Sequence, residues 1–279
     1  MEPLDDYDVD RQPFEPDGNG DTQRAWLFVV AALLLVLAGL TAFVLWRRSL
    51  QSEPQPTAGR KQPEAVDARR PLGPPVESIE LPTLDLTDPL VRTLLGRLSS
   101  RPEIAAWLAS DGLIRNFVVS LDNVATGPSP ARHLRRLAPE QPFRVESRDS
   151  GIVIDARSYE RYNGIGDTVA SLDASGLAKI YSTLKPRLQE AHRELGHPES
   201  DLDAAVERAI ERLLQVPVIE TDVRVIVGGV SYEFEDEGLE ALSPAQKLLL
   251  RMGPRNVRLV QAKLREVAQA LGIPGARLP

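Results

Sequence analysis

The hydrophobic pattern divides the chain into one long uncharged run and a series of short amphipathic segments. The run extends from Ala25 to Trp46, between Arg24 and the pair Arg47–Arg48, and its 22 residues include no charged side chain. A helix of this length spans about 33 Å, which is enough to cross a hydrocarbon core of about 30 Å. Trp26 and Trp46 lie at its ends, where indoles favour the membrane interface. We therefore predict a transmembrane helix over residues 25–46, with the lipid bilayer as its partner.

Two other interpretations of this run are disfavoured by its surroundings. A cleavable signal peptide has an apolar stretch of about 7–15 residues, a basic start and small residues at its cleavage site. Here the preceding segment is acidic, the run is longer, and Arg47–Arg48 stands where the cleavage site would be. A core helix of a soluble protein usually keeps a polar face, and this run has none.

The segments on either side of the run differ in composition. Residues 1–24 hold eight Asp and Glu against two Arg, with few apolar side chains, which predicts a disordered acidic tail. Residues 47–80 contain six prolines, and proline favours an extended backbone, so this segment is predicted to be a linker. The remaining residues 81–274 are predicted to form a soluble domain.

Helical spacing of apolar residues dominates this domain. Ser243-Pro244-Ala245-Gln246 combines an N-cap, a first-turn proline and a capping-box glutamine, which predicts a helix start. Ser110 or Asp111 is the predicted N-cap of another helix, and Ser200 with Asp203 that of a third. The predicted helices cover residues 89–98, 102–108, 111–126, 177–195, 202–214, 244–252 and 255–271.

Two stretches alternate like strands instead. Residues 143–154 carry a turn signal at Asp149-Ser150-Gly151, and residues 222–234 carry one at Gly228-Gly229. The predicted fold class is therefore mainly α with two short β-hairpins, an α+β domain behind a single N-terminal transmembrane helix.

Composition narrows the function classes. The net charge is −7 and the chain has no cysteine. Disulfides and cysteine-based zinc sites are therefore excluded. From Glu80 onward acidic side chains outnumber basic ones by 28 to 25, so this part of the chain lacks the basic footprint of a nucleic-acid binder. We expect no nucleic-acid partner.

The orientation of the predicted span rests on two opposing observations. Two basic residues lie on its N-terminal flank and four on its C-terminal flank, at positions 47, 48, 60 and 61, which favours a cytoplasmic domain. A short tail, an uncleaved anchor and a Pro-rich spacer are instead the plan of many bacterial inner-membrane proteins with a periplasmic domain. We take the periplasmic location as the prediction.

Two groups of basic residues are the candidate binding sites. Arg132, Arg135 and Arg136 form the densest basic cluster, and guanidinium groups bind phosphate or carboxylate in a bidentate manner. Lys247 and Arg251 are spaced i, i+4 on one predicted helical face. The simpler alternative for both groups is a solvated or internally paired polar surface.

The search for metal and catalytic sites yields little. His192 and His197 are spaced i, i+5 with Gly196 between them, whereas helical metal ligands favour i, i+4, so no metal site is predicted. The chain has no Gly-x-Ser-x-Gly elbow and no phosphate-binding glycine loop, so no cofactor and no catalytic residue are predicted. The carboxylates of Glu235-Asp236-Glu237 leave a hydrolase open as an alternative.

Two strings resemble a known family. They are Pro-Glu-Ile-Ala-Ala-Trp-Leu, continuing to Leu-Asp-Asn-Val-Ala-Thr-Gly within residues 101–132, and Ala-Gln-Lys-Leu-Leu-Leu-Arg-Met-Gly-Pro-Arg-Asn at residues 245–256. Both are similar to the bacterial family catalogued as domain of unknown function 3014, over roughly residues 84–271. The resemblance implies a membrane segment ahead of the domain and brings no activity with it.

These observations favour a membrane-tethered module of the bacterial envelope that is not an enzyme. We expect it to bind a protein or an anionic envelope component. An envelope hydrolase with an unrecognised carboxylate site is the alternative.

Overall fold

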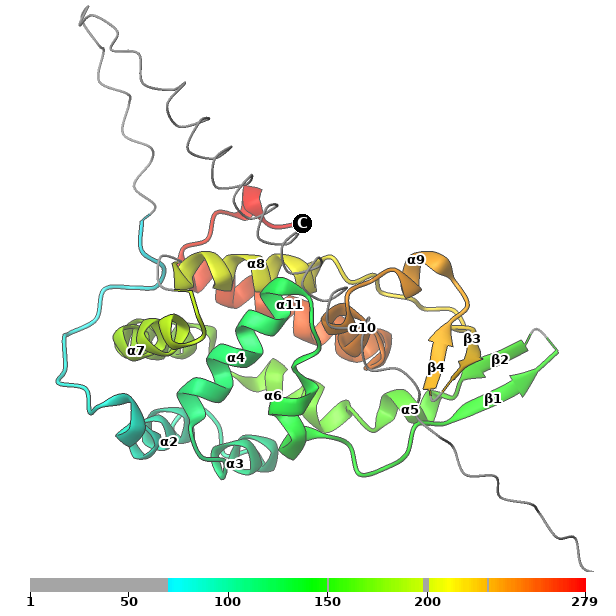
Figure 1. Cartoon of the computed structure of the whole chain (residues 1–279), viewed down its shortest axis with the longest axis horizontal. Helices are drawn as coiled ribbons and strands as arrows, with labels where there is room; N and C mark the ends of the chain where they lie inside the picture. Colours follow the sequence, from blue (N-terminus) through cyan, green and yellow to red (C-terminus); the bar gives the residue numbers. More distant parts are fainter. Residues whose placement is uncertain (1–69, 150, 198–200, 230) are drawn as a thin grey trace, which may run out of the picture. The chain divides into compact units, whose positions relative to one another are not determined.

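The computed structural model describes residues 70–149, 151–197, 201–229 and 231–279 (Figure 1). The predicted acidic tail, transmembrane helix and most of the linker lie outside these ranges. The described residues belong to one compact unit, Arg69–Pro279.

The unit is mainly helical and carries two antiparallel hairpins, which confirms the predicted fold class for this part of the chain. Its elements are η1 Leu84–Leu86, α2 Asp88–Gly96, α3 Pro102–Leu108, α4 Leu113–Thr126, η2 Pro130–Leu137, β1 Val145–Arg148, β2 Gly151–Ile154, α5 Ala156–Glu160, α6 Asn163–Ser171, α7 Ala174–Glu194, α8 Leu202–Leu214, β3 Val225–Gly228, β4 Ser231–Phe234, α9 Glu237–Glu240, α10 Pro244–Leu250, α11 Gly253–Leu271 and η3 Gly275–Arg277.

The predicted capping box at Ser243 is confirmed. The Ser243 Oγ accepts a hydrogen bond from the backbone N–H of Gln246, and the Gln246 Oε1 accepts one from the backbone N–H of Ser243 at 3.1 Å. Pro244 occupies the first turn, where its missing donor costs nothing. Helix α10 therefore begins where the sequence predicts.

The predicted cap of α4 is wrong. Gly112 is the N-cap residue and has no side chain, while the backbone N–H groups of Gly112 and Leu113 donate to the Asp88 carboxylate at 2.8 and 2.9 Å. Asp88 is the first residue of α2, so a carboxylate from another helix replaces the expected Ser110 or Asp111. This contact fixes α2 against the start of α4.

The predicted cap of α8 is also wrong for Asp203. Asp201 is the N-cap residue, and its Oδ1 accepts from the backbone N–H of Asp203 at 3.0 Å. Asp203 is instead buried, with a relative exposure of 5%. Its carboxylate accepts hydrogen bonds from the Tyr181 hydroxyl at 2.5 Å and from the Leu72 N–H at 2.9 Å.

Helices were missed where the chain lacks a clear apolar stripe. Residues 130–137 form the short helix η2, and residues 156–171 form α5 and α6 ahead of the predicted long helix α7. In α6 the buried positions are Gly166 and Thr168, and its larger apolar residues Ile165 and Val169 are only half-buried, so the apolar stripe is short.

The two hairpins meet at one end of the helical body, on the right in Figure 1. Strand β1 pairs with β2 in the register Val145↔Ile154, and β3 pairs with β4 in the register Val225↔Phe234. A bridge between Val153 and Arg224 joins the hairpins, and the Ile154 N–H donates to the Val223 carbonyl at 3.0 Å.

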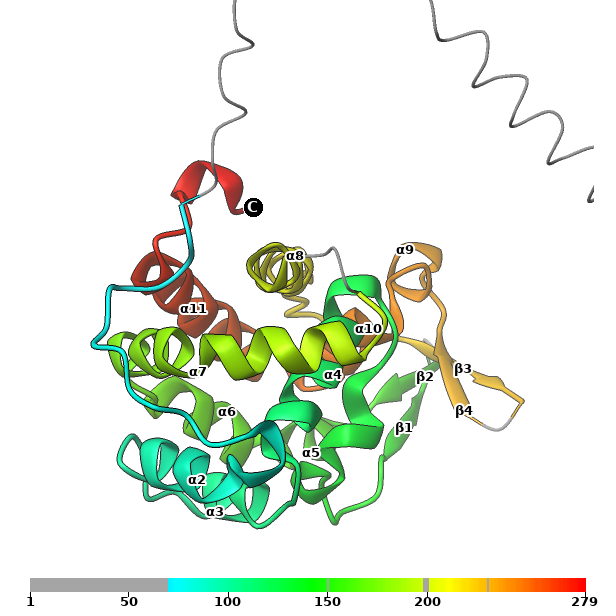
Figure 2. The same cartoon turned by 60° about the vertical axis from the view of Figure 1, so that its left-hand side comes forward.

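The buried apolar residues form two main clusters. One lies among α2, α4, α7, α8 and α11 and includes Leu113, Val118 and Leu202, each with a relative exposure of 0%. The other joins the hairpins to α10 and α11 through Val225, Phe234 and other side chains. Figure 2 shows α11 next to α7, with α2 and α3 together at the lower edge of the helical body.

The compact unit includes residues from the segment that was predicted to be a linker. Residues 70–83 form no helix or strand. Leu72 is nevertheless buried, and the Gly73 N–H donates to the Leu271 carbonyl at 2.9 Å. The end of the Pro-rich segment is therefore packed on α7, α8 and the end of α11.

Within the described ranges no single helix is long and apolar enough for a span; α3 and α4 together meet the criteria, with a bend of 106° between them. The span predicted at residues 25–46 lies outside these ranges.

Candidate functional site

An apolar cavity of about 340 Å³ lies among α4, η2, α7, α8 and α11, and we refer to it as the α4–η2 cavity. Nearly all its wall is apolar, and Tyr181 and Ser120 are the lining residues that carry a hydroxyl. Six of the lining residues are Phe117, Val124, Leu134, Leu177, Val206 and Val267.

Phe117 lines this cavity and is partly in contact with solvent, with a relative exposure of 39%. A second cavity of about 350 Å³ shares Phe117, Ser120 and Leu134 with the first, so the two adjoin. Apolar surface on this face of α4 is thus left without a covering element among the described residues.

Helix η2 borders the cavity and carries the predicted arginine cluster. The Ser129 Oγ caps it by accepting from the Ala131 N–H at 3.3 Å, and Pro130 occupies its first turn. Pro130 and Leu134 line the cavity. The helix is kinked at Leu134, which has a φ of −110°.

Arg132, Arg135 and Arg136 are exposed on η2. None of their side chains forms an ion pair or hydrogen bond with another residue in the described ranges. Three guanidinium groups without a partner in the described part of the chain therefore lie on the same eight-residue segment as Pro130 and Leu134. The sequence singled out the arginines and gave no sign of the cavity.

The second predicted basic pair has a different environment. Lys247 Nζ contacts the Glu240 carboxylate at 2.5 Å and donates to the Glu240 carbonyl at 3.0 Å. Arg251 donates to the Tyr232 carbonyl at 3.1 Å and lies 5.1 Å from the centre of the Phe234 ring. Hydrogen bonds from Lys247 and from the Phe234 N–H lower the pKa of Glu240. These cations hold α10 against α9 and the second hairpin.

Of the three carboxylates considered for a hydrolase, Glu235 and Asp236 line a cleft of about 550 Å³, together with Asp222, whereas Glu237 does not line it. The three lining carboxylates each have a partner. Glu235 pairs with Arg224 at 2.6 Å, Asp222 pairs with Arg148, and Asp236 accepts from the Leu239 N–H as the N-cap of α9. The arrangement stabilises the hairpin and the short helix that follows it.

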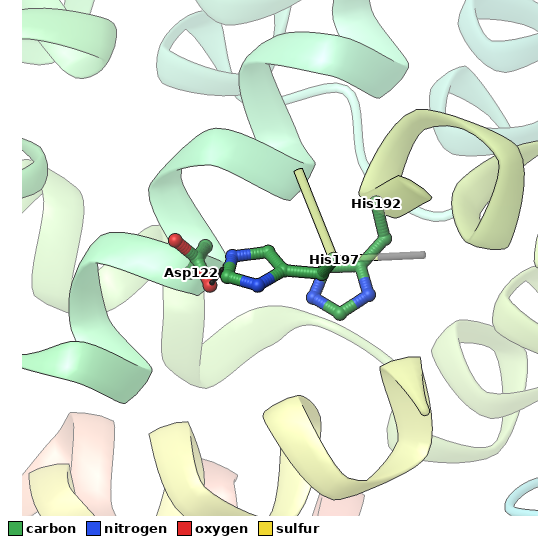
Figure 3. A group of neighbouring side chains, drawn as sticks. All are labelled: Asp122, His192 and His197. Atoms are coloured by element: carbon green, nitrogen blue, oxygen red, sulfur yellow. Dashed lines mark ion pairs between the residues drawn. The ribbon is translucent and has the colours of Figure 1, made fainter. Parts of the chain in front are cut away.

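Sequence reasoning also missed a group of Asp122, His192 and His197, which we refer to as the His–Asp cluster (Figure 3). His197 Nε2 lies 3.2 Å from the Asp122 Oδ1, and the rings of His192 and His197 stack with centroids 5.0 Å apart. His192 is almost fully buried, at 1% exposure. Burial, followed by the neighbouring His197, lowers the pKa of His192.

The C-terminal end of α7 explains why the i, i+5 spacing of His192 and His197 did not predict that they lie together. Helix α7 ends at Glu194, and Gly196 takes a φ of +95°, a left-handed conformation that suits glycine. The chain then folds back, so His197 stacks on His192 although their i, i+5 spacing would separate them on a continuous helix. Gly196, which interrupts the helical spacing in the sequence, therefore allows His197 to reach His192.

The described residues form a mainly helical α+β domain with an apolar cavity beside three arginines that have no ion pair among those residues. The chain belongs to the family described as proteins of unknown function (DUF3014), whose model matches residues 113–268. This confirms the family resemblance and spans the structure from the start of α4 to the last turns of α11. No curated protein and no solved structure matches the chain.

The string at residues 245–256 that carries part of the resemblance has a structural explanation. The Gln246 Nε2 donates to the Arg212 carbonyl at 3.0 Å, at the end of α8. Asn256 is 1% exposed, and its Nδ2 donates to the carbonyls of Met252 and Tyr159 at 2.8 and 3.3 Å. These residues join α10, α11, α8 and α5, so the string reflects packing.

Proposed function

We propose that this protein is a membrane-tethered binding module of the bacterial envelope whose domain takes up an anionic lipid. The acyl chain occupies the α4–η2 cavity and the anionic head group binds Arg132, Arg135 and Arg136. One observation carries the proposal: the same short helix lines an apolar cavity and presents three arginines that are unpaired within the described residues.

The dimensions and chemistry of the cavity support an amphiphilic ligand. A volume of about 340 Å³ falls within the range of small-molecule sites, roughly 300–1,000 Å³. An apolar wall favours a hydrocarbon chain, because each buried methylene contributes about 0.8 kcal/mol. Guanidinium groups suit the phosphate or carboxylate of a head group, which they bind through paired hydrogen bonds.

The location forms part of the proposal. Residues 25–46 anchor the chain in the inner membrane with a single span, and the linker holds the domain within reach of the bilayer, on the periplasmic side. Alkaline phosphatase fused after Pro279 is active only when exported. An active fusion supports the periplasmic location, whereas an inactive, stably produced fusion indicates a cytoplasmic domain.

The other candidate functions receive less support. A protein partner recognised through the arginines alone would leave the adjoining cavity unexplained. Glu235 binds the Arg224 cation and Asp236 accepts from a backbone N–H, so no specific observation favours a hydrolase. Lys247 and Arg251 act within the fold, and the proposed contact surface is η2 alone.

Retention of lipid by the purified protein tests the proposal. The full-length protein is purified from membranes, exchanged into lipid-free amphipol, extracted with organic solvent and examined by mass spectrometry. We expect about one equivalent of an anionic lipid. In parallel, an alkyne-tagged palmitic acid with a diazirine on its chain is photocrosslinked in cells, and we expect adducts on peptides of α4, η2 or α8.

Two pairs of variants separate the cavity from the arginines. Val124→Trp fills the cavity and is expected to remove the bound lipid, whereas Val227→Trp adds the same bulk at a site that is 71% exposed. The triple change of residues 132, 135 and 136 from Arg to Gln is expected to weaken retention. Its matched control changes exposed Arg97, Arg101 and Arg265 to Gln.

Retention that is equal in Val124→Trp and the unchanged protein would contradict a cavity-bound chain. Retention of neutral and anionic lipids alike would contradict the role of the arginines. Recovery of a crosslinked protein in place of lipid, lost only with the arginine triple variant, would favour the protein-binding alternative.

A further inference from the structure

The His–Asp cluster combines three donor groups from two separate parts of the chain. Asp122 lies on α4, His192 in the last turn of α7, and His197 beyond the left-handed turn at Gly196 (Figure 3). One donor atom from each residue lies within 4.8 Å of the other two. The fold therefore brings an aspartate close to two histidines that lie 70 and 75 positions later in the sequence.

The spacing of these donors suits a small metal ion. Two ligand atoms about 2.0–2.1 Å from a tetrahedral zinc ion lie roughly 3.3 Å apart. The His197 Nε2 and the Asp122 Oδ1 are separated by 3.2 Å. The His192 ring stacks on that of His197 with the centroids 5.0 Å apart, and a donor atom of His192 lies within 4.8 Å of the donor atoms of the other two residues.

The surroundings also favour a cation. The three donors carry one formal negative charge, and they lie at the C-terminal end of the 21-residue helix α7, where the helix dipole is negative. His192 is buried, whereas the side chains of Asp122 and His197 are 21% and 37% exposed. One side of the cluster is therefore enclosed by protein and the other is open to water.

The donor types select the class of metal. Imidazole nitrogen with a carboxylate suits zinc and neighbouring first-row transition metals, whereas magnesium and calcium favour oxygen ligands alone. Three protein ligands with one open position is the pattern of an accessible zinc site.

We propose that Asp122, His192 and His197 bind one zinc-class divalent transition-metal ion, with water in the fourth position. Bound metal would tie the end of α7 and the turn at Gly196 to α4. The site is separate from the proposed lipid site, because none of its three ligands lines the α4–η2 cavity.

Metal titration of the full-length protein tests this site. The protein is purified in detergent without an affinity tag, treated with EDTA, dialysed and titrated with Zn²⁺ by calorimetry. We expect one bound equivalent and a rise in the melting temperature. Titration with Co²⁺ is expected to give the visible absorption of a tetrahedral complex, which reports coordination independently of stability.

The chain provides a matched control, because His133 is its one remaining histidine and is not among the proposed ligands. His197→Ala and the nearly isosteric Asp122→Asn are each expected to weaken Zn²⁺ binding by more than the roughly 10–100-fold that loss of an outer-shell partner costs. His133→Ala is expected to bind as the unchanged protein does. The melting temperature of each apo variant shows that it is folded.

Two results would overturn the site. One is the absence of Zn²⁺ binding and of the Co²⁺ absorption in the folded, unchanged protein. The other is metal binding that persists undiminished in both His197→Ala and Asp122→Asn, which would place the metal elsewhere on the chain.

Discussion

The Tyr181 hydroxyl donates a hydrogen bond of 2.5 Å to the buried Asp203 carboxylate, joining the middle of α7 to the start of α8. Lys185 contacts the same carboxylate at 2.5 Å, and the Leu72 N–H donates to it at 2.9 Å. Burial and the hydrogen bond to Asp203 raise the pKa of Tyr181, so its proton is retained. One carboxylate thus fastens the segment before η1 to two helices.

Removal of the Tyr181 hydroxyl should therefore be costly. A hydrogen bond to a charged group contributes about 1.5–3 kcal/mol, and we expect Tyr181→Phe to lower the free energy of unfolding by that amount. Urea denaturation measures it. Tyr232→Phe is the control, since the Tyr232 hydroxyl forms no hydrogen bond with a described residue, and it should change stability by less than about 0.5 kcal/mol. Equal effects of the two changes would contradict the prediction.

The cap of α4 provides a second test. Asp88→Ala removes the acceptor for the N–H groups of Gly112 and Leu113, and loss of an N-cap acceptor costs about 0.5–2 kcal/mol. Asp111→Ala, at the cap position that the sequence suggests, should have almost no effect because its side chain is fully exposed. Denaturation of both variants compares the two carboxylates. A larger loss for Asp111→Ala would restore the local cap.

The N-caps of α10 and α4 differ in whether a local sequence pattern could predict them. The capping box at Ser243 was predictable because both partners lie within four residues and the bonds follow from local geometry. Asp88 lies 24 residues before the N–H group that it caps, and no local pattern marks that pairing. The hairpins were predictable for the same reason as the capping box, from turn residues between alternating strands.

The candidate sites show the same difference between local patterns, which the sequence reveals, and contacts between distant residues, which it does not. The arginines of η2 were visible as a local cluster, but the α4–η2 cavity was not, because each lining residue has the ordinary pattern of a core position. The contact between Asp122 and His197 joins residues 75 positions apart. The contact also depends on the left-handed conformation of Gly196, a residue that interrupts the helical spacing between His192 and His197.

Asp155 makes stability depend on acid pH. Hydrogen bonds from the Arg157 side chain and backbone lower the pKa of Asp155 from 3.8 to about 2. Because the folded pKa is below the unfolded value, the charged carboxylate stabilises the fold above about pH 4, and this contribution is lost as the pH falls towards 2. Asp155→Asn keeps an N-cap acceptor for α5 and removes the charge.

Melting temperatures measured between pH 7 and pH 2 check this dependence. We expect Asp155→Asn to melt below the unchanged protein at pH 7 and the difference to shrink as the pH approaches 2. Asp149→Asn removes one charge from an exposed aspartate without an ion pair to a described residue, and should give no such trend. A difference that is constant over the whole range would exclude the carboxylate charge as its source.

Two glycines with the same positive φ allow backbone strain to be distinguished from close packing. Gly253 and Gly272 both have a φ of +82°. A Cβ atom at Gly253 would lie 2.5 Å from the Tyr159 Cγ, whereas one at Gly272 would have no atom within 4 Å. Left-handed strain of about 1–2 kcal/mol is expected for alanine at either position. Gly253→Ala should cost roughly 1–3 kcal/mol more, because α5 must move away from α11. Denaturation curves of both variants measure the difference, and equal losses would mean that Tyr159 yields without cost.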